Sequence, residues 1–122
     1  MTLKELYQEI GADYDQAIRT LRMEKLMDKH IRKFPANGAV KEMLSSGEEL
    51  DAQKIFESAH AVKGIAGNLG LKRMYELSSE LSEEFRPGTP RELTDAEVRT
   101  KLQEAKDLYR DILEAISRYE AG

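Results

Sequence analysis

The candidate side chain for group-transfer chemistry in this sequence is the imidazole of His60, one of only two histidines in the 122-residue chain. An imidazole nitrogen is a competent nucleophile near neutral pH and forms covalent intermediates, phosphorylated ones included. Lys63 follows three residues later, so on a helix its ammonium group lies one turn from the ring. There it can offset negative charge on a group attached to the imidazole. His60 and Lys63 are therefore the candidate residues for phosphoryl transfer.

The residues around His60 predict a helix with one buried side and one bare side. At about 100° per residue, four apolar residues fall within about 40° of Ile55 and form a stripe: Ala59, Val62, Ala66 and Leu69. His60, Gly64 and Gly67 fall at about 120–180° on the same wheel, with Lys63 near 80°. A glycine inside a helix costs about 0.5–1 kcal/mol relative to alanine. We expect Gly64 and Gly67 to clear room for a binding partner beside the ring, with close helix packing as the alternative.

The composition narrows the classes of protein to which the chain can belong. Nineteen basic and 23 acidic residues give a net charge of −4 without a basic run, which argues against a nucleic-acid partner. The absence of cysteine excludes disulfides, a thiolate nucleophile and a cysteine-based zinc site. No apolar run approaches the roughly 18 residues of a membrane span. We expect a cytoplasmic protein without membrane contact, folded as a single domain over residues 1–122.

Apolar residues recur at helical spacing over almost the whole chain, which predicts an all-α fold. The predicted helices cover about residues 3–10, 14–34, 38–47, 50–68, 71–85 and 94–119. Pro35 ends the second helix and Gly47 stops the third, while Thr94 to Glu97 has the form of a capping box for the last. The four long helices are expected to form an antiparallel four-helix bundle, with the two short ones as accessory helices.

The stretch His60-Ala61-Val62-Lys63-Gly64, with Gly70 ten positions after the histidine, resembles the signature of histidine-containing phosphotransfer (HPt) domains. The resemblance extends to the helix order and to the position of the histidine helix. It implies a helical bundle that relays phosphoryl groups between receiver-domain aspartates. Such a domain is a phosphocarrier rather than an enzyme, and it has no cofactor of its own.

The same resemblance implies a role for individual residues. His60 would be phosphorylated on the ring nitrogen farther from the backbone, Lys63 would stabilise the phosphoryl group, and Gly64 would leave room for the receiver. Many family members orient the ring with a glutamine or glutamate on the next helix. The matching position here is Ser82, with Glu83 beside it. The implied partners are response-regulator receiver domains and a hybrid sensor histidine kinase, and we expect the protein to be a monomer.

Two other functions are alternatives to the phosphocarrier. The first is a non-phosphorylated helical adaptor that binds a receiver domain or a kinase through its surface alone. The second is a metal site, because Glu57 and His60 form one Glu-x-x-His unit of the type found in di-iron bundles. Such a site needs a second unit, and His30 has Met27 in place of the second glutamate. We therefore predict no metal ligands.

Overall fold

The computed structural model describes all 122 residues and contains seven α-helices, one 3-10 helix and no strand. It confirms the predicted all-α fold. The elements are α1 (Leu3–Glu9), α2 (Tyr14–Leu21), α3 (Glu24–Lys33), η1 (Phe34–Ala36), α4 (Ala39–Glu48), α5 (Ala52–Leu69), α6 (Lys72–Glu84) and α7 (Asp95–Ala121). None of these helices is both long enough and apolar enough to cross a membrane.

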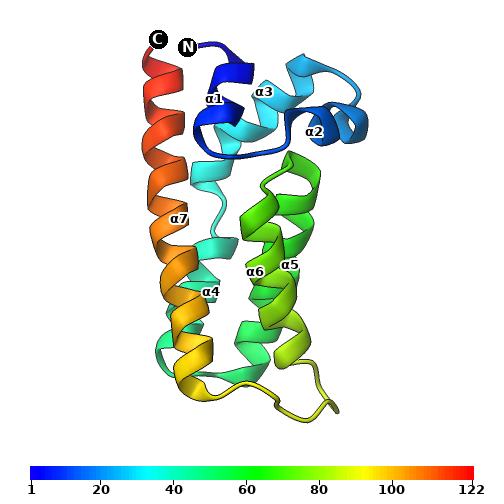
Figure 1. The fold of residues 1–122 in the computed structure, drawn as a ribbon, viewed down its shortest axis with the longest axis vertical. Coiled ribbons are helices and arrows are strands. Elements are labelled where there is room, and N and C mark those ends of the chain that lie inside the picture. The colour runs from blue at the N-terminus through cyan, green and yellow to red at the C-terminus, as the bar shows by residue number, and fades with distance from the viewer.

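Helices α4, α5, α6 and α7 form the body of the molecule. Each contacts the next, and α7 also contacts α4, so the four helices form a closed ring. Successive helices in this ring run in opposite directions (Figure 1). α7 is the longest helix and begins with the predicted capping box between Thr94 and Glu97. In this arrangement of four helices, α7 lies diagonally across from α5, the helix that carries His60.

The prediction of one continuous helix over residues 14–34 is wrong, because the chain turns at Arg22 and Met23 between α2 and α3. Arg22 has a φ of 75°, in the left-handed region, which ends α2. In one straight helix, Met27 would lie about 180° around the axis from Ile18. The break allows both residues to pack, since Met27 is fully buried and Ile18 lies against the core.

Breaking that helix changes which elements build the bundle. The short helix α4, expected to be an accessory, is a member of the four-helix ring, and α3 also contacts both α5 and α7. Gly47 does not stop α4 as predicted but lies inside it, buried against α7. A β-carbon at Gly47 would lie 2.5 Å from Leu102 Cδ1, so the glycine allows α4 and α7 to approach closely.

The short helices α1 and α2 cover the end of the bundle where α5 finishes (Figure 1). The backbone nitrogen of Asp13 donates to the carbonyl oxygen of Gly70 at 2.8 Å, which joins the start of α2 to the end of α5. Gly70 has a φ of 71°, and a side chain there would meet the backbone oxygen of Asp13. Both the turn and the close approach therefore require glycine.

At the opposite end, the buried carboxylate of Glu84 organises the loop between α6 and α7. It accepts hydrogen bonds from Arg91 Nε at 2.6 Å and from the backbone nitrogens of Glu92 and Leu93. Burial raises the pKa of Glu84, but these hydrogen bonds outweigh it and hold the pKa below its usual value. The Arg91 guanidinium also lies 4.5 Å from the centre of the Phe85 ring.

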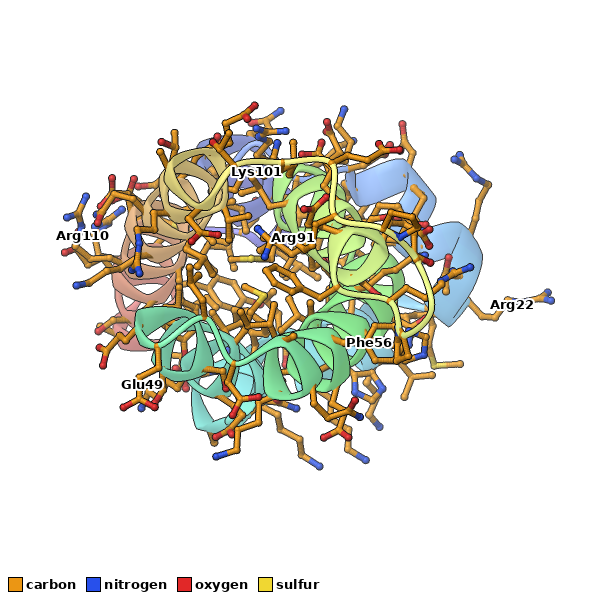
Figure 2. All side chains as sticks on the ribbon, turned by 90° about the horizontal axis from the view of Figure 1, so that it is seen from below. Arg22, Glu49, Phe56, Arg91, Lys101 and Arg110 are labelled. Carbon is orange, nitrogen blue, oxygen red and sulfur yellow. The ribbon has the colours of Figure 1, made fainter.

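One continuous cluster of 26 buried apolar residues forms the core. Viewed along the bundle, the interior is filled by these side chains, while Arg22, Glu49 and Arg110 point outward (Figure 2). Helix α5 contributes five residues to the core, and they are the members of the predicted stripe: Ile55, Ala59, Val62, Ala66 and Leu69. The prediction of the buried side of α5 is confirmed.

Candidate functional site

Helix α5 is fixed at both ends, and this determines which side of it faces solvent. The Asp51 carboxylate accepts a hydrogen bond from the backbone nitrogen of Lys54 at 3.2 Å, which caps the first turn. Gly70 ends the helix in the left-handed conformation. Since the stripe that starts at Ile55 is buried, the side with His60 is turned outward, and His60 is exposed.

The His60 ring stacks on the ring of Phe56, one helical turn earlier. The ring centroids are 6.1 Å apart and the ring planes differ by 24°. The two rings are stacked, and the distance between their centroids is within the usual range for aromatic pairs. Phe56 is half-buried and packs against the core. Phe56 is not among the site residues predicted from the sequence, although its four-residue spacing from His60 places the two side chains one helical turn apart.

Lys63 is half-buried and lies on the same side of α5 as His60, one turn farther along the helix. Its Nζ atom lies 5.9 Å from the centre of the Tyr75 ring on α6, at the outer limit of a cation–π contact. No carboxylate lies within 4.0 Å of the ammonium group, so Lys63 forms no ion pair. Its charge is available to an anionic group on the neighbouring imidazole.

The two glycines on this side of α5 differ in their surroundings. Gly64 is exposed, and a β-carbon built on it meets no atom within 4 Å. Packing within the chain therefore does not require glycine at position 64. Gly67 is half-buried, and a β-carbon built on it would lie 3.5 Å from the Tyr75 ring; its carbonyl oxygen accepts a hydrogen bond from Gln16 Nε2. Only Gly64 leaves an open, uncovered surface beside His60.

Neither residue suggested for orienting the ring forms a hydrogen bond with His60. Ser82 is buried on α6, with 4% of its surface exposed. Glu83 is exposed and pairs with Arg86, with 2.5 Å between Oε1 and Nη2. The structure therefore brings His60 and Lys63 together on one side of α5, but not Ser82 or Glu83 to the ring. The aromatic ring that pairs with the imidazole is that of Phe56.

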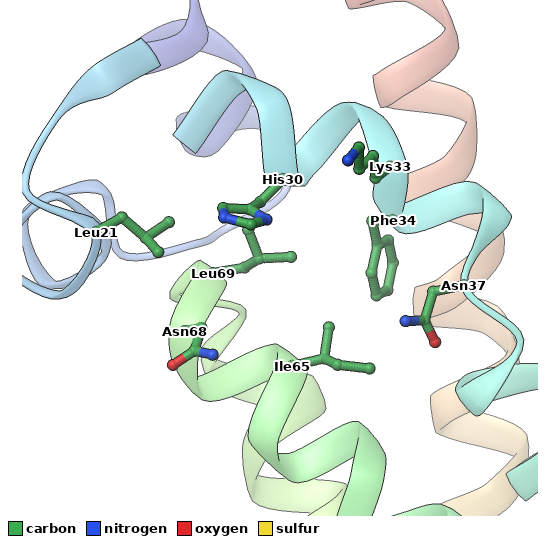
Figure 3. Close-up of a pocket in the computed structure, with 8 residues that line it drawn as sticks. All are labelled: Leu21, His30, Lys33, Phe34, Asn37, Ile65, Asn68 and Leu69. Carbon is green, nitrogen blue, oxygen red and sulfur yellow. The ribbon is translucent and has the colours of Figure 1, made fainter. Parts of the chain in front are cut away.

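The second histidine, His30, belongs to a different part of the surface. It lies on α3 and is exposed at the rim of a cavity of about 240 Å³ between α3, η1 and α5 (Figure 3). Leu69 and Ile65 of α5 face this cavity, and Asn68 lies beside them. His30 is therefore separate from the phosphoryl-transfer candidates.

Glu57 and His60 are not arranged as metal ligands. Glu57 accepts a hydrogen bond from Gln53 Nε2 at 2.7 Å along the surface of α5. No group of three or more histidine, aspartate or glutamate side chains in the structure is placed to hold a metal ion. The site thus consists of an exposed imidazole, an unpaired ammonium group and an open glycine surface.

Comparison with known proteins gives one match. The family model described as "Hpt domain" matches residues 3–118, which is nearly the entire chain. No curated protein and no solved structure matches the chain. The matched region includes every residue of the site described above.

Proposed function

Because the chain belongs to the Hpt domain family, we propose that it carries a phosphoryl group on His60 and exchanges it with receiver-domain aspartates. Hpt domains are phosphocarriers in phosphorelay signalling and interact with receiver domains and kinases. The observation that supports His60 as the carrier is its position: it is exposed on α5, beside an unpaired Lys63 and the open surface at Gly64.

In the proposed transfer, the nitrogen of His60 farther from the backbone, Nε2, attacks the phosphorus of a receiver's aspartyl phosphate. The new N–P bond forms as the bond from phosphorus to the carboxylate oxygen breaks, and the aspartate leaves as a carboxylate. The proton on Nδ1 stays on the ring during the attack. The reverse reaction on a second receiver's aspartate returns the imidazole to its starting state. Transfer is therefore reversible, because no step consumes a nucleotide.

Lys63 and Gly64 have separate roles in this proposal. The Lys63 ammonium offsets charge on the phosphohistidine, because it forms no ion pair and lies one turn away. Gly64 lets the receiver's active-site loops come close to the ring, because no side chain of this protein occupies that space. The receiver supplies the acidic pocket and its Mg²⁺, and a hybrid sensor histidine kinase supplies the phosphoryl group from ATP.

The proposal is tested with a receiver domain that carries a radiolabelled aspartyl phosphate. Incubation with the wild-type protein is expected to produce an acid-labile, alkali-stable label, as a phosphohistidine gives. The label is expected to disappear in His60→Gln and to persist in the matched control His30→Gln, because His30 lies outside the site.

Two results would refute the carrier role. A label that persists in His60→Gln would place the phosphoryl group on another residue. Stable binding to the receiver without any label would instead favour the non-phosphorylated adaptor.

A further inference from the structure

The exposed His60 ring has no hydrogen-bonding partner within the protein to hold its orientation. Ser82 and Glu83, which occupy the corresponding region of α6, are respectively buried and paired with Arg86. A surface histidine without such a partner samples several rotamers. A phosphoacceptor must instead present a nitrogen along the line of attack, so some other contact has to restrict the ring.

Phe56 supplies the one aromatic contact to this ring. The two residues are four apart on α5, and their rings are stacked with planes 24° apart. Phe56 is itself restrained, because it is half-buried and packs against the core. Figure 2 shows Phe56 away from the centre of the bundle. The imidazole therefore rests on a side chain that the fold keeps in place.

The geometry of stacking suits a ring that reacts through its edge. Stacked rings interact through their faces, whereas the lone pair of an unprotonated ring nitrogen lies in the plane of the imidazole. Contact with Phe56 therefore restricts rotation of the ring and leaves the nitrogens uncovered for attack on phosphorus. A hydrogen bond from α6 would instead orient the imidazole through one of its nitrogens.

We propose that Phe56 is a positioning residue for phosphoryl transfer, which holds the His60 ring by stacking in the absence of a hydrogen-bonding partner on α6. This inference rests on the proposed function of His60. Phe56 does not touch the phosphoryl group in this scheme, and its effect is on the orientation of the imidazole.

The test compares Phe56→Leu, which keeps an apolar side chain, with Phe56→Tyr, which keeps the aromatic ring. The first measurement is the NMR chemical shift of the His60 ring protons in the unphosphorylated protein, where the ring current of Phe56 is felt. We expect these shifts to move toward free-histidine values in Phe56→Leu and to stay near wild type in Phe56→Tyr. Unchanged shifts in Phe56→Leu would overturn the proposal.

The second measurement is single-turnover transfer from a phosphorylated receiver, at a series of receiver concentrations. In Phe56→Leu we expect the maximal rate to fall about two- to tenfold, the range of a stacking contact, with little change in the receiver concentration at half-maximal rate. Phe56→Tyr should restore the rate. Equal losses in both variants, or a loss confined to receiver affinity, would contradict a positioning role.

These two measurements separate the proposal from the function on which it rests. A wild-type protein that accepts no phosphoryl group would refute the proposed function, and with it any role of Phe56 in transfer. The NMR comparison would then still decide whether Phe56 orients the ring. Retained circular dichroism and thermal unfolding of Phe56→Leu serve as the folding control.

Discussion

Replacing Gly64 with glutamine should make the protein more stable and a poorer transfer partner. Glutamine is close to alanine in helix propensity, and glycine costs about 0.5–1 kcal/mol relative to alanine inside a helix. The structure adds no opposing term, because a β-carbon at Gly64 meets nothing within 4 Å. We therefore expect the free energy of unfolding to rise by about 0.5–1 kcal/mol.

This gain corresponds to a measurable shift in the unfolding temperature. An unfolding entropy of about 2.1 cal/mol/K per residue amounts to about 0.26 kcal/mol/K for 122 residues. The melting temperature should accordingly rise by about 2–4 °C, measured by calorimetry or circular dichroism. The same substitution should lower the apparent affinity for a phosphorylated receiver about five- to 150-fold, because overpacking a close contact costs about 1–3 kcal/mol.

A matched control is Ser117→Gln, an exposed position on α7, diagonally across the bundle from α5. It introduces the same side chain and should leave receiver affinity unchanged. A lower melting temperature for Gly64→Gln would refute the claim that position 64 is open. Wild-type receiver affinity in Gly64→Gln would show that this surface is not where the receiver binds.

Three further predictions concern Lys63, Gly70 and Glu84. Lys63→Ala should leave thermal unfolding unchanged, because Lys63 forms no ion pair, and should shorten the lifetime of phosphohistidine about two- to fivefold, measured as the label that remains after an alkaline quench; a wild-type lifetime would rule out the assigned role. Gly70→Ala should lower the free energy of unfolding by about 2 kcal/mol or more, because it combines a left-handed residue with a contact to the Asp13 backbone oxygen, and an unchanged denaturant midpoint would contradict this. Glu84→Gln should cost about 1–3 kcal/mol at pH 7, because it weakens the hydrogen bonds from Arg91 and the loop backbone. Since the pKa of Glu84 is lowered by folding, this contribution is present above its unfolded value of 4.5 and is lost as pH falls toward the folded value, so the two proteins should converge in acid denaturation; a constant difference down to pH 2 would refute it.

The helix of the site could be predicted from the sequence because its signals are local and agree with one another. The stripe from Ile55 to Leu69 has a single periodicity, and the glycine at position 70 marks its end. The exposed position of His60 follows from these two features. The proposed role of Phe56 rests on a pairing within the same helix, but inferring it also requires knowing that α6 offers the imidazole no hydrogen bond.

The break between α2 and α3 could not be read from the usual signals, because Arg22 adopts the left-handed conformation without being glycine. The helical periodicity does indicate the break, because Ile18 and Met27 would fall on opposite sides of one continuous helix. At Gly47, by contrast, the sequence predicts a helix end that the structure does not have. This glycine resembles a helix stop in the sequence, yet it serves the packing of α4 on Leu102, a contact between residues far apart in the chain.

The packing of α5 on α6 also bears on how the molecule folds. This is the most extensive contact between two helices in the structure, and Gly70 and Leu71 alone connect them. Contacts between residues close in the chain have a low cost of loop closure, whereas the ion pair of Arg118 with Glu9 joins opposite ends of the sequence. We expect the α5–α6 hairpin to be structured in the folding transition state, with α1 docking on α7 afterwards. The surface that carries His60 would then be among the first parts of the protein to reach its native form during folding.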